Sequence, residues 1–194
     1  MKNSNQEGLE LIITKLLTAL DEDPNREGLK ETPQRMAKMY NELLCGYKAD
    51  PKSVFKVFDS EYYHGLIVVS DINFFSLCEH HLIPFYGKIH IGYVPNGKVL
   101  GLSKFARLVE IFSRRLQLQE RLTKQIEDTI TKYLRPLGVI VYCEAEHLCM
   151  SMRGVKKNGS KAKTLSKSGL METNKTLVEE FFMQINSKTE THSI

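Results

Sequence analysis

This sequence has few cysteines, no long apolar run and little excess charge, and each of these features excludes a class of protein. Four cysteines in 194 residues do not make a disulfide scaffold, so metal ligation or core packing in a reducing compartment explains them better. No apolar run approaches the about 20 residues that span a bilayer. The net charge of +4 is too small to indicate a nucleic-acid binder, although it suits an anionic small molecule.

The N-terminus also lacks the basic-then-apolar order of a signal peptide, since it reads MKNSNQEGLE. We therefore expect a cytoplasmic protein that does not associate with a membrane. Hydrophobic residues make up 42% of the chain and charged residues 26%, so the chain can bury a core and is not broadly disordered.

The first 50 residues are predicted to be helical. Apolar residues recur there at helical spacing, at Leu9, Ile12, Ile13, Leu16, Leu17 and Leu20. After a polar break, Thr32 and Pro33 are predicted to be the N-cap and first residue of a second helix, which Gly46 ends.

From about residue 66 the pattern changes to the alternation of strands, with LIVVSDINFF and YGKIHIGYVP. Ser103 is predicted to cap a helix, a second helix ends before Pro136, and GVIVYCEAEHLCMSMRG is predicted to be one strand. A Lys/Ser-rich stretch after Ser160 and a last helix follow. This order indicates an α+β fold, in which helices back an antiparallel sheet.

Two short clusters of histidine and cysteine could bind a metal. Cys78-Glu79-His80-His81 places a thiol and an imidazole three residues apart, and His147-x-Cys149 would share one face of the predicted strand. The candidate ligands are Cys78, His80, His81, His147 and Cys149. Four protein ligands would make a structural zinc site, whereas three leave an open position at which water can be activated.

Other residues have ordinary explanations as well as functional ones. Cys143 lies too far along the strand from Cys149 to share an ion, so we assign it to core packing. Cys45 ends an apolar helix face and is assigned to the core as well. Ser103 and Lys104, at a predicted helix N-terminus, suit a phosphate group. Glu120 lies among arginines and by itself would be a salt-bridged surface residue.

Four segments of the chain together resemble the zinc-dependent GTP cyclohydrolase I family. They are ETPQRMAKMYNELLCGY, SLCEHHLIPFYGKIHIGYVP, GLSKFARLVEIFSRRLQLQERLTKQI and HLCMSMRGV, in that order between Leu29 and Val155. The resemblance implies the tunnelling fold, an antiparallel sheet with helices on one face, in residues 51–194, preceded by the helical segment 1–50. It also implies a homodecamer of two stacked pentamers, with active sites at subunit interfaces and GTP as the substrate.

The resemblance further implies a role for each candidate residue. Cys78, His81 and Cys149 would bind Zn²⁺, which leaves His147 as a general acid and His80 for proton transfer at the ribose. Glu120 would accept hydrogen bonds from guanine with help from Gln119. The triphosphate contacts would be Ser103, Lys104, Arg107, Arg153 and Arg35. The reaction would open the imidazole ring of GTP at C8, release formate and yield 7,8-dihydroneopterin triphosphate for folate or pterin biosynthesis.

Two other classes fit parts of the sequence. Nitrile reductases of the same fold use a cysteine nucleophile and a nicotinamide cofactor without zinc, and the Cys-Glu-His-His run argues against them. A zinc-stabilised nucleic-acid-binding module would need zinc coordinated by four protein ligands and a continuous basic face with exposed aromatic residues. The sequence indicates neither clearly.

Overall fold

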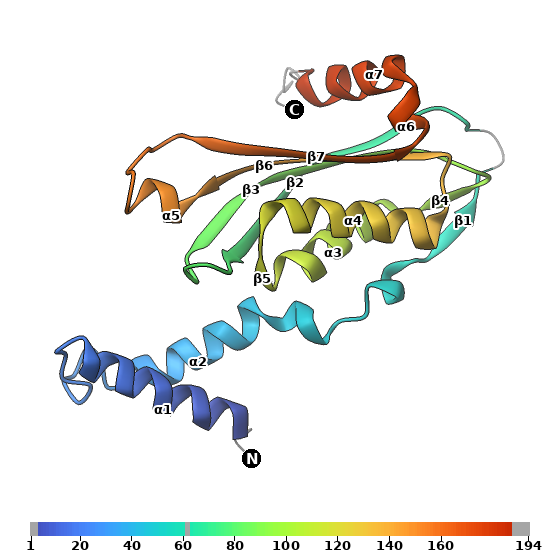
Figure 1. Cartoon of the computed structure of the whole chain (residues 1–194). Helices are drawn as coiled ribbons and strands as arrows, with labels where there is room; N and C mark the ends of the chain where they lie inside the picture. Colours follow the sequence, from blue (N-terminus) through green and yellow to red (C-terminus); the bar gives the residue numbers. More distant parts are fainter. Residues whose placement is uncertain (1–3, 61–62, 188–194) are drawn as a thin grey trace, which may run out of the picture. The chain divides into compact units, whose positions relative to one another are not determined.

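The computed structural model describes residues 4–60 and 63–187, which divide into two compact units, 1–45 and 46–194. The first unit contains helices α1 (Ser4–Ala19) and α2 (Thr32–Leu43), which pack side by side (Figure 1). Ile13 of α1 and Ala37 of α2 are buried, so the predicted helical pair is present. Two details of the prediction are wrong: the N-cap of α2 is Glu31 rather than Thr32, and Cys45 is exposed rather than packed.

The second unit is built on a five-stranded sheet with the strand order β5-β2-β3-β6-β7. Its strands are β2 (Ile67–Cys78), β3 (Pro84–Val94), β5 (Leu116–Gln117), β6 (Gly138–His147) and β7 (Lys161–Gly169). All neighbours are antiparallel except β5, a two-residue strand parallel to the end of β2. Strands β1 (Val57–Asp59) and β4 (Lys98–Leu100) form a separate antiparallel ribbon.

Helices α3 (Leu102–Ser113) and α4 (Gln119–Leu134) cover one face of this sheet (Figure 1). Their apolar sides, with Phe105 and Ile126 at full burial, meet the inward-facing residues of β3 and β6, such as Ile89 and Val141. Burial of this apolar surface is the main stabilising contribution to the unit. The predicted α+β class, an antiparallel sheet with covering helices after a helical segment, is confirmed.

A further helix, α7 (Lys175–Asn186), lies on the opposite face of the sheet after the short helix α6 (Leu170–Thr173) (Figure 1). Phe181 of α7 is fully buried against Ile140 and Gly92. A Cβ atom at Gly92 would lie 2.7 Å from the Phe181 ring, so the glycine makes room for this contact. The prediction placed helices on one face of the sheet, but α7 also covers part of the opposite face.

Three local predictions in this unit are wrong. Helix α3 is preceded by Gly101 as its N-cap, so Ser103 lies inside its first turn. Strand β6 ends at His147, and the chain then forms a single turn of helix, α5 (Leu148–Ser151). The Lys/Ser-rich stretch, for which no strand was predicted, is strand β7, paired along its length with β6.

Polar side chains join α4 to β7 along a seam. Residues 119, 123, 127 and 131 recur every four positions on α4 and therefore share one side of the helix. Each is hydrogen-bonded to β7, in the pairs Gln119–Ala162, Thr123–Thr164, Glu127–Ser166 and Thr131–Ser168. This α4–β7 seam explains why β7 lacks the apolar alternation of a half-buried strand, because its inward residues are small and, apart from Ala162, polar.

The one ionised member of the seam, Glu127, is 1% exposed. Burial by itself would raise the pKa of Glu127, but hydrogen bonds from Lys124, Ser168 and Thr131 outweigh burial and hold the pKa below its usual value. A lowered pKa means that the carboxylate stabilises the folded state above its unfolded-state pKa of about 4.3. That contribution is lost as the pH falls through the folded-state pKa.

We therefore expect Glu127→Gln to lower the free energy of unfolding at pH 7 by about 1–3 kcal/mol, because it leaves buried donors poorly paired. The same variant should lose less stability than the wild type when the pH is lowered from 5 to 3. Urea unfolding at a fixed protein concentration measures both effects, with the exposed Glu179→Gln as a control. Equal acid sensitivity of Glu127→Gln and wild type would contradict this account of the carboxylate.

Within the described residues, no helix is long and apolar enough to cross a membrane.

Candidate active site

A cluster of possible metal ligands forms where β2 ends and α5 begins. Cys78 is the last residue of β2, His81 lies in the following turn, and Cys149 lies on α5. One ligand atom from each residue lies within 4.8 Å of the other two. The end of β2 and the start of α5 meet here because His147, the last residue of β6, pairs with Phe85 at the start of β3. Helix α5 therefore begins next to the β2–β3 turn.

The β2–β3 turn is held in a tight conformation that presents Cys78 and His81 together. The backbone N–H of Leu82 donates to the Cys78 carbonyl at 2.9 Å, and the N–H of Cys78 donates to the Ile83 carbonyl at 2.9 Å. Leu82 adopts a left-handed conformation with φ of 55°, which an L-residue rarely occupies. The neighbouring Glu79 forms two hydrogen bonds with Arg121 of α4, which fixes the turn to that helix.

The donor set of this cluster suits a soft-to-borderline divalent cation. Burial and the adjacent Cys78 thiol raise the pKa of Cys149, so two thiolates this close are unfavourable without a cation between them. Two thiolates and one imidazole are the ligands that zinc prefers, and three protein ligands are typical of catalytic rather than structural zinc sites.

His147 is held rigidly beside this cluster. Its ring stacks on Phe85 with a centroid distance of 4.6 Å and an interplanar angle of 5°. Its Nε2 atom lies 2.8 Å from Oε1 of Gln119. Burial lowers the pKa of His147, whereas the negative charge of Glu120 opposes this shift. His147 was predicted to share a strand face with Cys149, but the two lie on different elements and meet the cluster from β6 and α5.

Gln119 and Glu120 are the first two residues of α4, and their side chains differ in exposure. Gln119 is 2% exposed, and its side-chain amide is hydrogen-bonded to protein atoms at both ends. Glu120 is exposed in the single chain and close enough to His147 for its charge to affect that pKa. The carboxylate, rather than the neighbouring amide, is therefore the group open to a ligand.

Of the remaining predicted site residues, Arg153 and His80 lie near the cluster. Arg153 follows α5 and its charge lowers the pKa of Cys149, although burial and Cys78 together raise it. His80 is exposed in the β2–β3 turn, next to the ligand His81. Arg35 belongs to the first unit and forms an ion pair there with Glu31.

The structure does not bring Ser103, Lys104 and Arg107 to the metal cluster of their own chain. Helix α3 ends next to β5, whose Gln117 pairs with Cys78, so the C-terminal end of α3 is the end near the cluster. The three residues lie in the first half of this 12-residue helix. At 1.5 Å per residue, Ser103 lies about 15 Å farther along the helix axis than Ser113.

Two contacts of His147 were not predicted from the sequence, the stacking on Phe85 and the hydrogen bond with the amide of Gln119. Both depend on strand register, which the separate segments do not reveal. The alternation of Lys161, Lys163 and Lys167 with small residues was the available signal for β7, which supplies two of the acceptors for Gln119.

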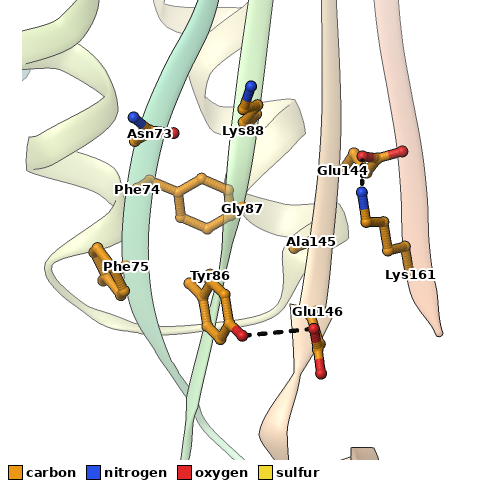
Figure 2. A pocket seen from close by; sticks show the side chains of 10 residues that line it. All are labelled: Asn73, Phe74, Phe75, Tyr86, Gly87, Lys88, Glu144, Ala145, Glu146 and Lys161. Carbon is orange, nitrogen blue, oxygen red and sulfur yellow. Dashed lines mark hydrogen bonds and ion pairs between the residues drawn. The ribbon is translucent and has the colours of Figure 1, made fainter. Parts of the chain in front are cut away.

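A separate groove of about 390 Å³ lies over β2, β3, β6 and β7 (Figure 2). Phe75 and Tyr86 stack there at 5.7 Å, and Lys161 pairs with Glu144. Tyr86 and Glu144 alternate with the buried Phe85 and Cys143, so the groove lies on the sheet face away from α3 and α4. None of the three metal-cluster residues lines it.

An α+β domain that combines a Cys₂His group able to hold a metal ion with a fixed histidine and an accessible carboxylate is typical of a hydrolytic enzyme. Comparison with known proteins identifies which kind. A family model described as GTP cyclohydrolase I matches residues 9–186. The chain belongs to the GTP cyclohydrolase I family of enzymes.

Curated relatives agree over nearly the whole chain. GTP cyclohydrolase 1 of Streptococcus pyogenes is 51% identical over 177 residues, 91% of each chain. The protein of that name from Caldanaerobacter subterraneus subsp. tengcongensis is 49% identical over 185 residues, 95% of this chain and 98% of its own. A solved structure described as archaeosine synthase QueF-Like in the apo form has a TM-score of 0.42 and 18% identity, covering 54% of this chain and 94% of its own. That weak likeness adds nothing to the family assignment.

Proposed function

We propose that Cys78, His81 and Cys149 bind Zn²⁺, and that the chain there opens the imidazole ring of GTP at C8. Formate is released, and rearrangement of the ribose followed by ring closure gives 7,8-dihydroneopterin triphosphate, a precursor of folates or other pterins. The observation that carries the proposal is the convergence of three ligand atoms within 4.8 Å, beside a fixed histidine, in a member of this family.

The donor set fits zinc because it offers two sulfur ligands and one nitrogen ligand with space for a fourth group. Zinc at such a site supplies a Lewis acid that makes water nucleophilic at neutral pH. The residues of the chain supply the remaining requirements, which are binding of the purine, binding of the triphosphate and proton transfer.

His147 is the proposed general acid. When the C8–N bond breaks, its electron pair remains on the ring nitrogen, which must take up a proton. A histidine can exchange that proton near neutral pH because its ordinary pKa is about 6.5. Burial lowers the pKa of His147, and the negative charge of Glu120 favours its protonated form. His80, exposed beside the cluster, is the proposed group for proton transfer at the ribose.

Glu120 is the proposed reader of guanine, since its carboxylate can accept hydrogen bonds from both N1–H and the 2-amino group. The triphosphate carries about four negative charges, which suit Lys104, Arg107 and Arg153. Ser103 would add a hydroxyl donor. Arg35 is a further proposed contact, from the helical segment.

We further propose a homodecamer of two pentamers with active sites at subunit interfaces. The position of Ser103, Lys104 and Arg107 supports it, because they lie far from the cluster of their own chain along α3 and can serve the site of a neighbouring subunit. Residues 1–50 would then be a helical segment and residues 51–194 the catalytic domain. The free thiols needed for zinc favour a reducing, cytoplasmic location.

Metal analysis of the purified protein, combined with an assay for formate released from GTP, tests the function directly. One zinc per subunit and one formate per GTP are expected. Formate release by a zinc-free protein, or no formate from a protein with one zinc per subunit, would overturn the proposal.

Substitution of His147 or His80, unlike substitution of a metal ligand, should leave zinc binding intact. We expect His147→Ala to keep one zinc per subunit yet lose about 10²–10⁴-fold in ring opening, as for loss of a general acid. His80→Ala should also keep zinc and accumulate a ring-opened intermediate. Zinc content, formate release and pterin fluorescence measure these effects, and the exposed His64→Ala is the control. Loss of zinc in either variant would place that histidine among the ligands.

A further inference from the structure

The side-chain amide of Gln119 can adopt only one orientation. Its Nε2 atom lies 3.1 Å from the Cys143 carbonyl oxygen, 3.1 Å from the Ala162 carbonyl oxygen and 3.2 Å from Oγ1 of Thr164. The two carbonyls can only accept hydrogen bonds, so they require the NH₂ group on this side. A flipped amide would bury its oxygen against the two carbonyl oxygens and lose both of these hydrogen bonds, at a cost of about 1–3 kcal/mol.

The fixed amide determines which nitrogen of His147 carries a proton. With Nε2 of Gln119 directed at the carbonyls, Oε1 faces Nε2 of His147 at 2.8 Å. An amide oxygen only accepts, so Nε2 of His147 must be the donor and must be protonated. In a neutral imidazole the lone pair then lies on Nδ1, for which residues 4–60 and 63–187 offer no hydrogen-bond partner.

We infer that Gln119 is a positioning residue for His147: it keeps Nε2 protonated and thereby makes Nδ1 the atom that exchanges a proton with the substrate. This inference rests on the proposed role of His147 and extends it to a single atom. The neutral ring takes up a proton from water at Nδ1, and as the C8–N bond of the purine breaks, the resulting imidazolium gives this proton to the departing nitrogen. It remains as a neutral ring whose Nε2–H is still bound to Gln119.

This role differs from the help in binding guanine that the family resemblance implied for Gln119. At 2% exposure and with its NH₂ group directed at protein acceptors, the side chain has no free donor to offer a base. The anchors also explain why the arrangement is rigid. They come from the adjacent strands β6 and β7, and stacking on Phe85 fixes the plane of the same imidazole.

The test uses Gln119→Met, which keeps the volume of the side chain and removes its hydrogen bonds. We expect kcat to fall at least about 10-fold, part of the 10²–10⁴-fold that general acid catalysis contributes, while zinc content and KM for GTP change little. The control is Thr131→Val, which removes a bond at the other end of the α4–β7 seam and should leave kcat unchanged. A raised KM with unchanged kcat would overturn the inference in favour of a guanine contact.

A double variant sharpens the test. If Gln119 acts through His147, adding Gln119→Met to His147→Ala should cause no further loss of ring opening. If the two losses multiply, Gln119 acts independently and the inference is wrong.

A spectroscopic measurement separates this inference from the proposed function. Solid-state ¹⁵N NMR of the sedimented protein, labelled at Nε2 of its six histidines, distinguishes protonated from bare Nε2 at pH 8. The His147 signal, assigned by its absence in His147→Ala, should be that of a protonated nitrogen and should become mixed in Gln119→Met. A bare Nε2 in the wild type overturns the inference. Full activity of His147→Ala would instead overturn the proposed role of His147.

Discussion

Replacement of Cys149 by alanine is expected to abolish both metal binding and the opening of the imidazole ring of GTP. Of the three ligands, Cys149 alone comes from α5, so its removal leaves only the two ligands of the β2–β3 turn. Loss of a partner that only orients a ligand costs about 10–100-fold in metal affinity or activity, and loss of a ligand should cost more. Cys78→Ala and His81→Ala should behave in the same way.

Zinc per subunit, measured by atomic emission, and formate release from GTP are the two readouts. Two cysteines of the same chain provide matched controls, the exposed Cys45→Ser and the buried Cys143→Ser. Both controls should keep one zinc per subunit, because neither thiol belongs to the cluster. Stoichiometric zinc and near-normal turnover in Cys149→Ala would show that the ligand assignment is wrong.

Glu120→Gln is expected to cause the second large loss, this time with zinc retained. A carboxylate gains two charge-assisted hydrogen bonds from N1–H and the 2-amino group of guanine, whereas an amide offers one acceptor and one donor. Sites that hydrogen-bond such groups can favour the correct substrate over an analogue that lacks them by about 10⁴-fold. Glu120→Ala should lose GTP turnover similarly and gain little with ATP, because removing an unfavourable contact does not create a favourable one.

GTP turnover, affinity for a guanine nucleotide and zinc content should be measured for the wild type and both variants. The control is Asp128→Asn on the same helix, which changes an exposed carboxylate paired with Lys124. Near-wild-type affinity and turnover in Glu120→Ala would mean that Glu120 is a surface glutamate and that another group reads guanine.

Local sequence patterns were sufficient for much of this fold. The apolar spacing of α4 and the alternation in β2 and β3 predicted these elements, because each buries one face against the core. The pair Cys78 and His81 was also predictable, since three residues within one turn bring two ligands together whatever the rest of the chain does.

What the sequence could not predict depends on contacts between distant segments. The chain beyond His147 was expected to continue as a strand, but a turn of helix carries Cys149 to the cluster. Strand β7 was missed because its inward face meets polar groups of α4, so it lacks the apolar alternation on which strand prediction relies. Cys45 was assigned to the core from its place on an apolar helix face, yet it lies at the exposed end of that segment.

The α4–β7 seam also makes the edge of the sheet intolerant of pairing errors. Successive side chains of β7 point to opposite faces, so a slip of one residue would turn Lys161, Lys163 and Lys167 toward α4 and its buried Glu127, and would remove the small hydroxyl residues from the seam. Hydrogen bonds, unlike an apolar surface, do not form at intermediate positions. Because the same seam ends at the amide that holds His147, a misregistered chain would lose its catalytic geometry as it lost its edge strand. The register of β7 and the orientation of His147 therefore depend on the same hydrogen-bonded residue, Gln119.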